Sequence, residues 1–219
     1  MYAYHRTWVY LVLILTCSFF SDTVKAEDFA AAVAAGKIKV AFRGTGGSSG
    51  DSVEAIVTRT DKAGSNLELT IAPGTRLQSG NAAAQSMVIA AVEGQVMSES
   101  SYSPSSVIEV GDTPRTYVFE AYCSDFEKDN PSSATLFTLG TVDPVLACIF
   151  SAASQLSVQA RQAAVWIYTD KTSFSHVNAK FDVSQSDWDA AAAIVRKCSS
   201  KAQPNKTSSG ANTKQGNHE

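Results

Sequence analysis

Histidine is scarce in this chain, whose 219 residues include only His5, His176 and His218. The sequence has none of the His-rich or paired-cysteine spacings that bind zinc, and we expect neither a metal nor another cofactor. A thiol hydrolase would have to pair Cys123 with His176 as nucleophile and base. No third orienting residue or family signature accompanies that pair, so this is the weakest of the functional alternatives.

The chain also lacks a strong charge of either sign. Its formal net charge is −3 at pH 7, which is too mild to indicate nucleic acid or an anionic membrane as a partner. An acidic run of Asp125, Glu127 and Asp129 follows Cys123. Its spacing fits no calcium loop, and we expect a solvated turn.

Long hydrophobic runs are missing as well. The apolar run from Trp8 to Thr16 is too short to span a bilayer, and nothing later approaches the roughly 20 apolar residues that a transmembrane helix needs. Arg6 precedes this run, and the segment Val24 to Ala26 resembles a cleavage site. These features predict a signal peptide over residues 1–26 and a secreted, extracellular protein.

A bacterial lipoprotein is the alternative processing route. Residues Ile14 to Cys17 loosely match a lipoprotein cleavage box. Lipidation at Cys17 would anchor the protein at a membrane surface, or in the periplasm, instead of releasing it.

Period-two alternation dominates the chain between residues 27 and 122. Apolar and polar residues alternate around Val40, Ala55 and Leu69, and turn-forming stretches separate these segments at short intervals. The glycine-rich stretch from Gly44 to Asp51 lacks the ending of a phosphate-binding loop and predicts a hairpin loop. About seven short strands predict an antiparallel β-sandwich of Ig-like character.

Helical periodicity replaces this pattern over residues 123–199. Asp143 followed by Pro144 predicts one helix start, and Ser157 predicts a second. Ser186 and Asp189 form a capping box for a third helix. The fold class is therefore α+β, with a small helical subdomain after the sandwich, and residues 200–219 predict a disordered polar tail.

Cysteines are few, and signal cleavage would leave Cys123, Cys148 and Cys198. An odd number in an oxidising compartment predicts one disulfide and one remaining sulfur. Cys148 and Cys198 lie on the apolar stripes of two predicted helices, which favours a bond between them, although three pairings are possible.

Gln162 lies on the apolar face of the second predicted helix, together with Val158, Val165 and Trp166. A buried amide is costly unless it is hydrogen-bonded. It is either a core glutamine bonded to backbone or the partner of Cys123, which ends an inward-facing strand pattern.

Two segments resemble the motifs of thioester domains (TQxA domains) from bacterial surface adhesins. One is Ala121–Tyr122–Cys123, with Lys128 and Pro131 following, and the other runs from Arg161 to Trp166 and on to Asp170. Arg161 stands where that family typically has threonine. The resemblance implies an internal thioester between the Cys123 thiol and the Gln162 acyl group, with Tyr122 and Trp166 lining the site and excluding water.

The sequence thus predicts a secreted or surface adhesion module that attaches to amine-bearing ligands or surface proteins. Such an attachment is a single-turnover reaction, so the protein would not be an enzyme in the ordinary sense. The alternative is a non-covalent extracellular interaction or structural protein with one disulfide, in which Gln162 is a satisfied core amide.

Overall fold

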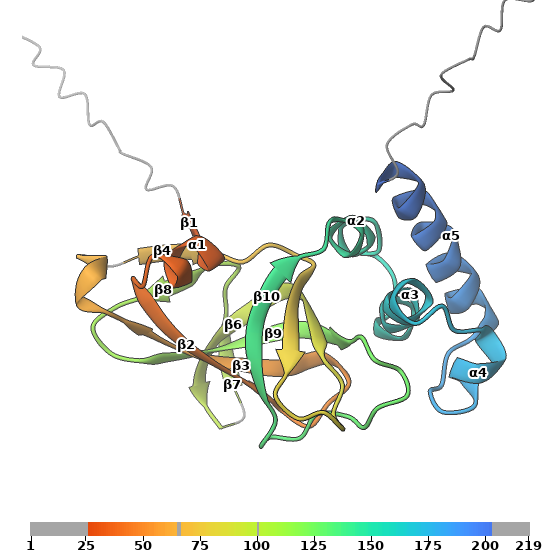
Figure 1. Cartoon of the computed structure of the whole chain (residues 1–219), viewed down its shortest axis with the longest axis horizontal. Coiled ribbons are helices and arrows are strands. Elements are labelled where there is room, and N and C mark those ends of the chain that lie inside the picture. The colour runs from red at the N-terminus through yellow and green to blue at the C-terminus, as the bar shows by residue number, and fades with distance from the viewer. Residues whose placement is uncertain (1–25, 65–66, 100, 203–219) are drawn as a thin grey trace, which may run out of the picture.

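Six strands close into an antiparallel barrel in the computed structural model, which describes residues 26–64, 67–99 and 101–202 (Figure 1). Around the barrel the strands follow the order β5 (Thr75–Ser79), β10 (Leu136–Val142), β2 (Ile38–Gly44), β3 (Ser49–Arg59), β9 (Arg115–Cys123) and β6 (Met87–Ser98). A pairing between β5 and β6 completes the circle.

The prediction of an Ig-like sandwich is therefore wrong, although the α+β class is partly consistent with the structure. Alternating apolar residues predict a strand with one buried face, but they do not say which strands become neighbours. Here β5 pairs with both β10 and β6, so one closed sheet replaces two facing sheets. Strand β10 begins at Leu136, beyond residue 122 where we placed the end of the sandwich.

A small second sheet covers one end of the barrel. It contains β1 (Glu27–Asp28), β4 (Leu67–Thr70) and β8 (Ile108–Val110), with β1 parallel to β4 and β8 antiparallel to it. A short edge strand, β7 (Ser101–Pro104), forms a hairpin with β6, and a 3₁₀ turn spans Asp61–Ala63.

The barrel core is aromatic at this end. Helix α1 (Phe29–Ala34) begins after Asp28, whose side chain accepts a hydrogen bond from the Ala31 backbone. Phe29 packs on Phe42, which in turn packs edge-on against Phe119, with ring centroids 5.9 and 5.8 Å apart. All three rings are almost completely buried, so α1 closes this end of the barrel by packing Phe29 into the core.

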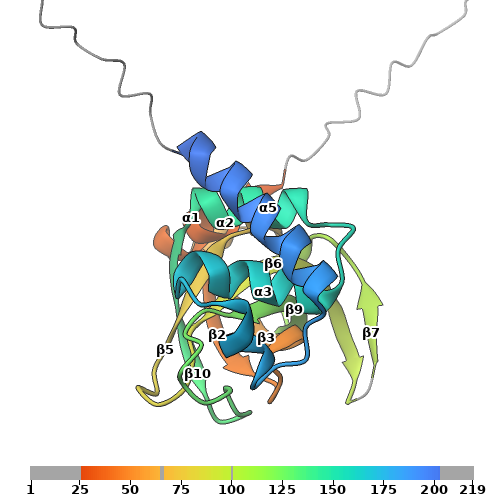
Figure 2. The same cartoon turned by 90° about the vertical axis from the view of Figure 1, so that its right-hand side faces the viewer.

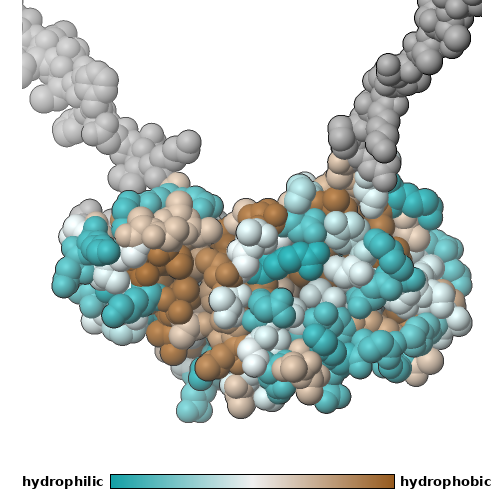
Figure 3. Space-filling view, in the orientation of Figure 1, coloured by the Kyte–Doolittle hydropathy of each residue, from teal (hydrophilic) through white to brown (hydrophobic). Residues whose placement is uncertain are grey.

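Apolar residues also reach the outside of the barrel. In Figure 3 they form a band in the region that β2 and β10 occupy in Figure 1. Leu136 of β10 is 62% exposed. The register between β10 and β2 contains two residue pairs, Leu136 with Arg43 and Phe137 with Phe42, so this is a short seam of the barrel.

Four helices lie together on one side of the barrel (Figures 1 and 2). They are α2 (Pro144–Ala152), α3 (Val158–Thr169), α4 (Phe174–Asn178) and α5 (Gln185–Ala202). Asp143 and Ser157 cap α2 and α3, as their sequence positions predict. For α5 the capping side chain is Ser184, which accepts from the Asp187 backbone, rather than Ser186.

The predicted disulfide between Cys148 and Cys198 is confirmed. It joins α2 to α5 with a Cα separation of 5.7 Å, and Cys123 is a free, buried cysteine. The α2 and α5 helices face each other through Cys148 and Cys198, and α3 packs against both of them.

Two predictions fall largely outside the described residues, namely the signal peptide over residues 1–26 and the polar tail over residues 200–219. Residues 200–202 of that tail are the last turn of α5. Within the part of the chain that the structure describes, no helix combines the length and the apolar character needed to cross a membrane.

Gly74, just before β5, packs against the backbone at the start of α2, and this contact leads to a stability prediction. Its φ is +83°, and a Cβ there would lie 2.6 Å from the backbone atoms Asp143 O and Ala147 N of α2. Gly64 has a similar φ of +72° but open space around it. Gly64→Ala is expected to cost about 1–2 kcal/mol of unfolding free energy through backbone strain. Gly74→Ala should cost about 1–3 kcal/mol more, because the methyl group meets backbone.

Urea denaturation of both variants measures the difference. Equal losses for Gly74→Ala and Gly64→Ala would show that α2 moves away from Gly74 without cost, contrary to the close packing described.

Candidate functional site

Cys123 is the last residue of β9 and is completely buried. Strand β6 flanks it on one side, where Cys123 is in register with Met87. On the other side, the glycine-rich β2–β3 loop brings in the carbonyl of Ser48, which accepts a hydrogen bond from the Cys123 N–H at 3.0 Å. The cysteine therefore sits where the barrel ends and the helices begin.

Gln162 meets Cys123 from α3. The Ser157 cap fixes the start of this helix, and Gln162 lies on its buried face with no exposed surface. Its Oε1 accepts from the Cys123 N–H at 3.1 Å, and its Nε2 donates to the Cys123 carbonyl at 2.8 Å. The Cys123 N–H is thus shared between Ser48 and Gln162.

This pairing fixes the carboxamide of Gln162 next to the atoms that carry the thiol. The oxygen and the nitrogen of the amide bind the N–H and the C=O of one residue, which is the pair of hydrogen bonds that a neighbouring antiparallel strand makes. The carbonyl carbon between them, Cδ, must then lie beside the Cα of Cys123. The Sγ atom, two bonds from that Cα, contacts the thioether of Met87 at 3.4 Å. Rotation about the Cα–Cβ bond of Cys123 is the motion that moves Sγ relative to Cδ.

The site is completely buried and disfavours charge. Burial raises the pKa of the Cys123 thiol well above its usual range, and the negative charge of Asp125 adds to this effect. The thiol is therefore protonated at neutral pH. A low-dielectric site of this kind also keeps water away from any activated acyl group.

A second set of contacts joins the segment after Cys123 to the end of α3. The Phe126 N–H donates to Asp170 Oδ1 at 3.1 Å, and the Phe126 ring packs edge-on against Trp166 with centroids 4.9 Å apart. Trp166 follows Gln162 by one helical turn and is 3% exposed. The two segments that resemble the adhesin motifs therefore contact each other from the middle of α3 to its C-terminal cap.

A small cavity lies beside the pair. Its volume is about 150 Å³, and three aromatic residues, Phe126, Trp166 and Phe181, form part of its lining. Ser48, the backbone partner of Cys123, also lines it. Trp166 thus lines a cavity next to the pair, while its predicted role in lining a thioester stays a prediction.

Tyr122 lies on the opposite face of β9 from Cys123, because side chains alternate along a strand. Its ring stacks on Phe150 of α2 at 5.4 Å, and the Arg161 guanidinium lies 5.7 Å from its centroid. Arg161 also forms an ion pair with Glu120, which accepts a hydrogen bond from the Tyr122 hydroxyl. Tyr122 therefore packs between the barrel and the helices α2 and α3, and it does not line the 150 Å³ cavity.

Glu93 is a further carboxylate that the charges of this ion pair influence. Burial raises its pKa, and the negative charges of Glu120 and Asp51 raise it further, while Arg161 lowers it. The Arg161 guanidinium thus interacts favourably with both Glu120 and Glu93 at the junction between the barrel and the helices.

The structure does not bring His176 to Cys123. His176 Nε2 lies 2.9 Å from Glu127 Oε1, and its ring packs edge-on against Phe126. The nucleophile and base that a thiol hydrolase would require are thus held by different partners. Among the described residues, no group of three or more histidine, cysteine or acidic side chains is placed to hold a metal ion.

Two contacts of the site were not predicted from the sequence, those of Ser48 and Met87 with Cys123. Ser48 lies in the glycine-rich stretch that we interpreted as a plain hairpin loop. Met87 begins a predicted strand, but only the register between β6 and β9 places it opposite Cys123. Comparisons with protein-family models, curated proteins and solved structures found no match.

Proposed function

We propose that this protein is an extracellular attachment module that bonds covalently to primary amines through a thioester between Cys123 and Gln162. The observation that carries the proposal is the pair of hydrogen bonds, 3.1 and 2.8 Å long, that hold the Gln162 carboxamide on the backbone of Cys123. This contact holds a buried acyl group on the backbone of a buried cysteine from a segment 39 residues away.

The chemistry is balanced without any oxidant or cofactor. Cys123 Sγ attacks Gln162 Cδ, an S–C bond forms, the C–N bond of the amide breaks, and the thiol proton leaves with the nitrogen as ammonia. A target amine then attacks the same carbon. An amide bond to the target forms, and the Cys123 thiol is regenerated.

The surroundings of Gln162 support both steps. The Cys123 N–H already points at Oε1, the atom on which negative charge develops during attack, and such a preorganised donor stabilises that charge. Burial of both residues excludes the water that would otherwise hydrolyse the thioester. The cavity beside the site, which aromatic and polar side chains line together, is the route by which we propose that the amine enters.

Intact-mass measurement of the freshly purified protein tests the proposal. We expect a mass lower than that of the sequence, with the disulfide counted, by one ammonia. After treatment with methylamine, the mass should rise by one methylamine, bound to the Gln162 acyl group, and the Cys123 thiol should become free. Cys123→Ala should abolish both the deficit and the adduct.

Resistance of Cys123 to alkylation is not diagnostic, because burial alone protects the thiol. The matched control is therefore alkylation after unfolding in denaturant without methylamine. A reactive Cys123 thiol under those conditions, together with a full native mass, would contradict the thioester.

The non-covalent interaction protein is the second candidate. It is favoured by the fact that the Gln162 amide, as it stands, has partners for both its oxygen and its nitrogen. In that case Gln162 has a purely structural role. A full native mass combined with ligand binding that survives Cys123→Ala would support this candidate.

A further inference from the structure

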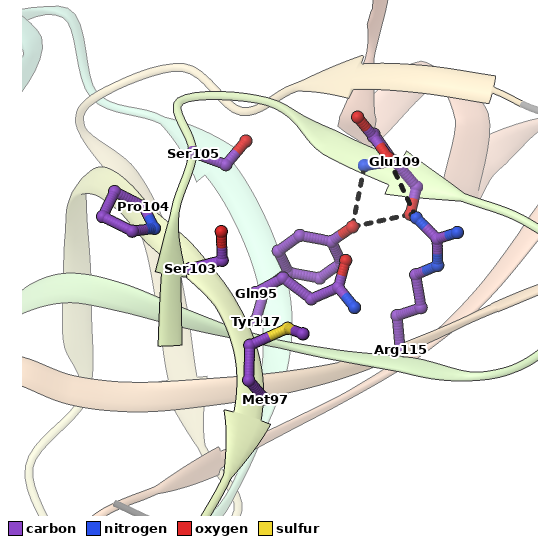
Figure 4. Close-up of a pocket in the computed structure, with 8 residues that line it drawn as sticks. All are labelled: Gln95, Met97, Ser103, Pro104, Ser105, Glu109, Arg115 and Tyr117. Atoms are coloured by element: carbon purple, nitrogen blue, oxygen red, sulfur yellow. Dashed lines mark hydrogen bonds and ion pairs between the residues drawn. The ribbon is translucent and has the colours of Figure 1, made fainter. Parts of the chain in front are cut away.

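A larger cavity, with a volume of about 370 Å³, lies between the β6–β7 hairpin and β8 (Figure 4). Strands β6, β7 and β9 contribute most of its lining, and β8 closes one side. We propose that this cavity binds a neutral carbohydrate. The volume falls within the range of roughly 300–1,000 Å³ that small-molecule sites occupy.

Strand register explains why polar side chains gather there. Gln95 of β6 is in register with Ser103 of β7 on one side and with Tyr117 of β9 on the other. These three residues form a row across neighbouring strands. Arg115 lies two positions along β9 from Tyr117, so its side chain projects from the same face. Met97 lies at an irregularity in the pairing of β6 with β7, and it too lines the cavity.

Some of these polar groups already form hydrogen bonds within the protein, and these bonds hold one wall of the cavity in place. The Tyr117 hydroxyl donates to the Glu109 carbonyl at 2.6 Å and accepts from the Glu109 N–H at 2.9 Å. Arg115 Nη1 donates to Glu109 Oε2 at 3.0 Å. Figure 4 shows both interactions on the same side of the cavity.

Other groups keep hydrogen-bonding capacity for a ligand. Within the described part of the chain, the Gln95 carboxamide and the Ser103 hydroxyl have no protein partner, and Figure 4 shows both at the cavity. Arg115 retains N–H donors beyond those that bind Glu109. The site therefore offers donors and acceptors side by side, which suits the adjacent hydroxyl groups of a sugar.

Charge and apolar surface favour the same ligand class. Arg115 and Glu109 carry opposite charges in direct contact, so the cavity has no excess charge to select an anion or a cation. Met97, which is 66% exposed, provides apolar surface at the cavity for the C–H faces of a sugar ring. A mostly polar lining with apolar surface from Met97 and Pro104 matches a neutral polyhydroxyl compound better than a lipid or a nucleotide.

Saturation-transfer NMR and calorimetry on the full chain test the proposal, with a panel of neutral hexoses, N-acetylhexosamines and their disaccharides as probes. At least one should bind, and Gln95→Ala should weaken its binding about tenfold. Arg115→Ala should weaken it similarly. The matched controls are Gln185→Ala on α5 and Arg43→Ala, which removes an exposed Arg–Glu ion pair elsewhere on the barrel.

The Arg115 variant also loses the contact with Glu109, so Ser103→Ala provides a second, milder test. Cys123→Ala should leave sugar binding unchanged, which separates this proposal from the thioester. The proposal is overturned if the folded protein binds no neutral sugar of the panel. It is also overturned if Arg43→Ala weakens binding as much as Arg115→Ala, or if the site takes charged sugars alone.

Discussion

Removal of the Cys148–Cys198 disulfide should lower the free energy of unfolding by about 4 kcal/mol. The bond closes a loop between residues separated by 50 positions, and the unfolded chain gains the entropy of that loop when the bond is lost. The loop contains α3 and most of α5, so the helices that cover Cys123 should loosen first. Urea denaturation of a Cys148→Ala/Cys198→Ala variant measures the loss.

Comparison with the reduced wild-type protein separates the cross-link from packing. Both proteins lack the covalent bond, but only the variant lacks the sulfur atoms. Agreement between them within about 1 kcal/mol would assign the effect to the cross-link. If the double variant lost less than about 1 kcal/mol of unfolding free energy, packing of α2 on α5 would be sufficient to hold the helices without the disulfide.

Arg161→Met should cost about 3–5 kcal/mol, because it leaves the Glu120 carboxylate between the barrel and α3 without its cationic partner. The two side chains are only 19% and 11% exposed, so water compensates little for the lost charge. The matched control is Arg43→Met, whose partner Glu54 lies on the outer barrel surface, and which should change stability by less than about 0.5 kcal/mol.

A double variant provides the decisive comparison. Arg161→Met combined with Glu120→Leu removes both charges and should recover most of the lost stability. If the single variant Arg161→Met were as mild as Arg43→Met, the ion pair would not contribute to docking of the helices on the barrel.

Local features of the fold were predictable from the sequence. Asp143 before Pro144 and Ser157 before an apolar stripe specify helix starts through their own side-chain oxygens, and both caps are present. The pairing of Cys148 with Cys198 followed from their positions on apolar helix stripes. The caps were predictable because each depends on residues close in sequence, and the inward position of each cysteine depends on one face of its own helix.

Closure of the barrel was not predictable in this way. Strand β5 is short and follows a turn at Pro73 and Gly74, and β10 lies after the segment that we assigned to the sandwich. Their pairing depends on residues about 60 positions apart, for which alternation gives no signal. The same number of short strands fits a sandwich or a barrel, so the choice between them was open to error.

The candidate site shows a similar division. The apolar position of Gln162 on its helix indicated that the amide needs a buried partner, and the structure provides the backbone of Cys123. The contribution of Ser48 depends on the path of a glycine-rich loop, which sequence periodicity does not describe. Arg161, which departs from the adhesin motif, contacts Glu120 and Tyr122 on the other face of β9.

The disulfide also determines how mechanical tension passes through the molecule. A pulling force applied to the chain beyond Cys198 is transmitted through the sulfur atoms directly to Cys148. When force is applied at the two ends of the chain, the segment between the two cysteines, which includes Gln162, is bypassed and bears no load. A target held by Gln162 would consequently be attached to a part of the chain that cannot be unravelled from the C-terminal side while the disulfide is intact.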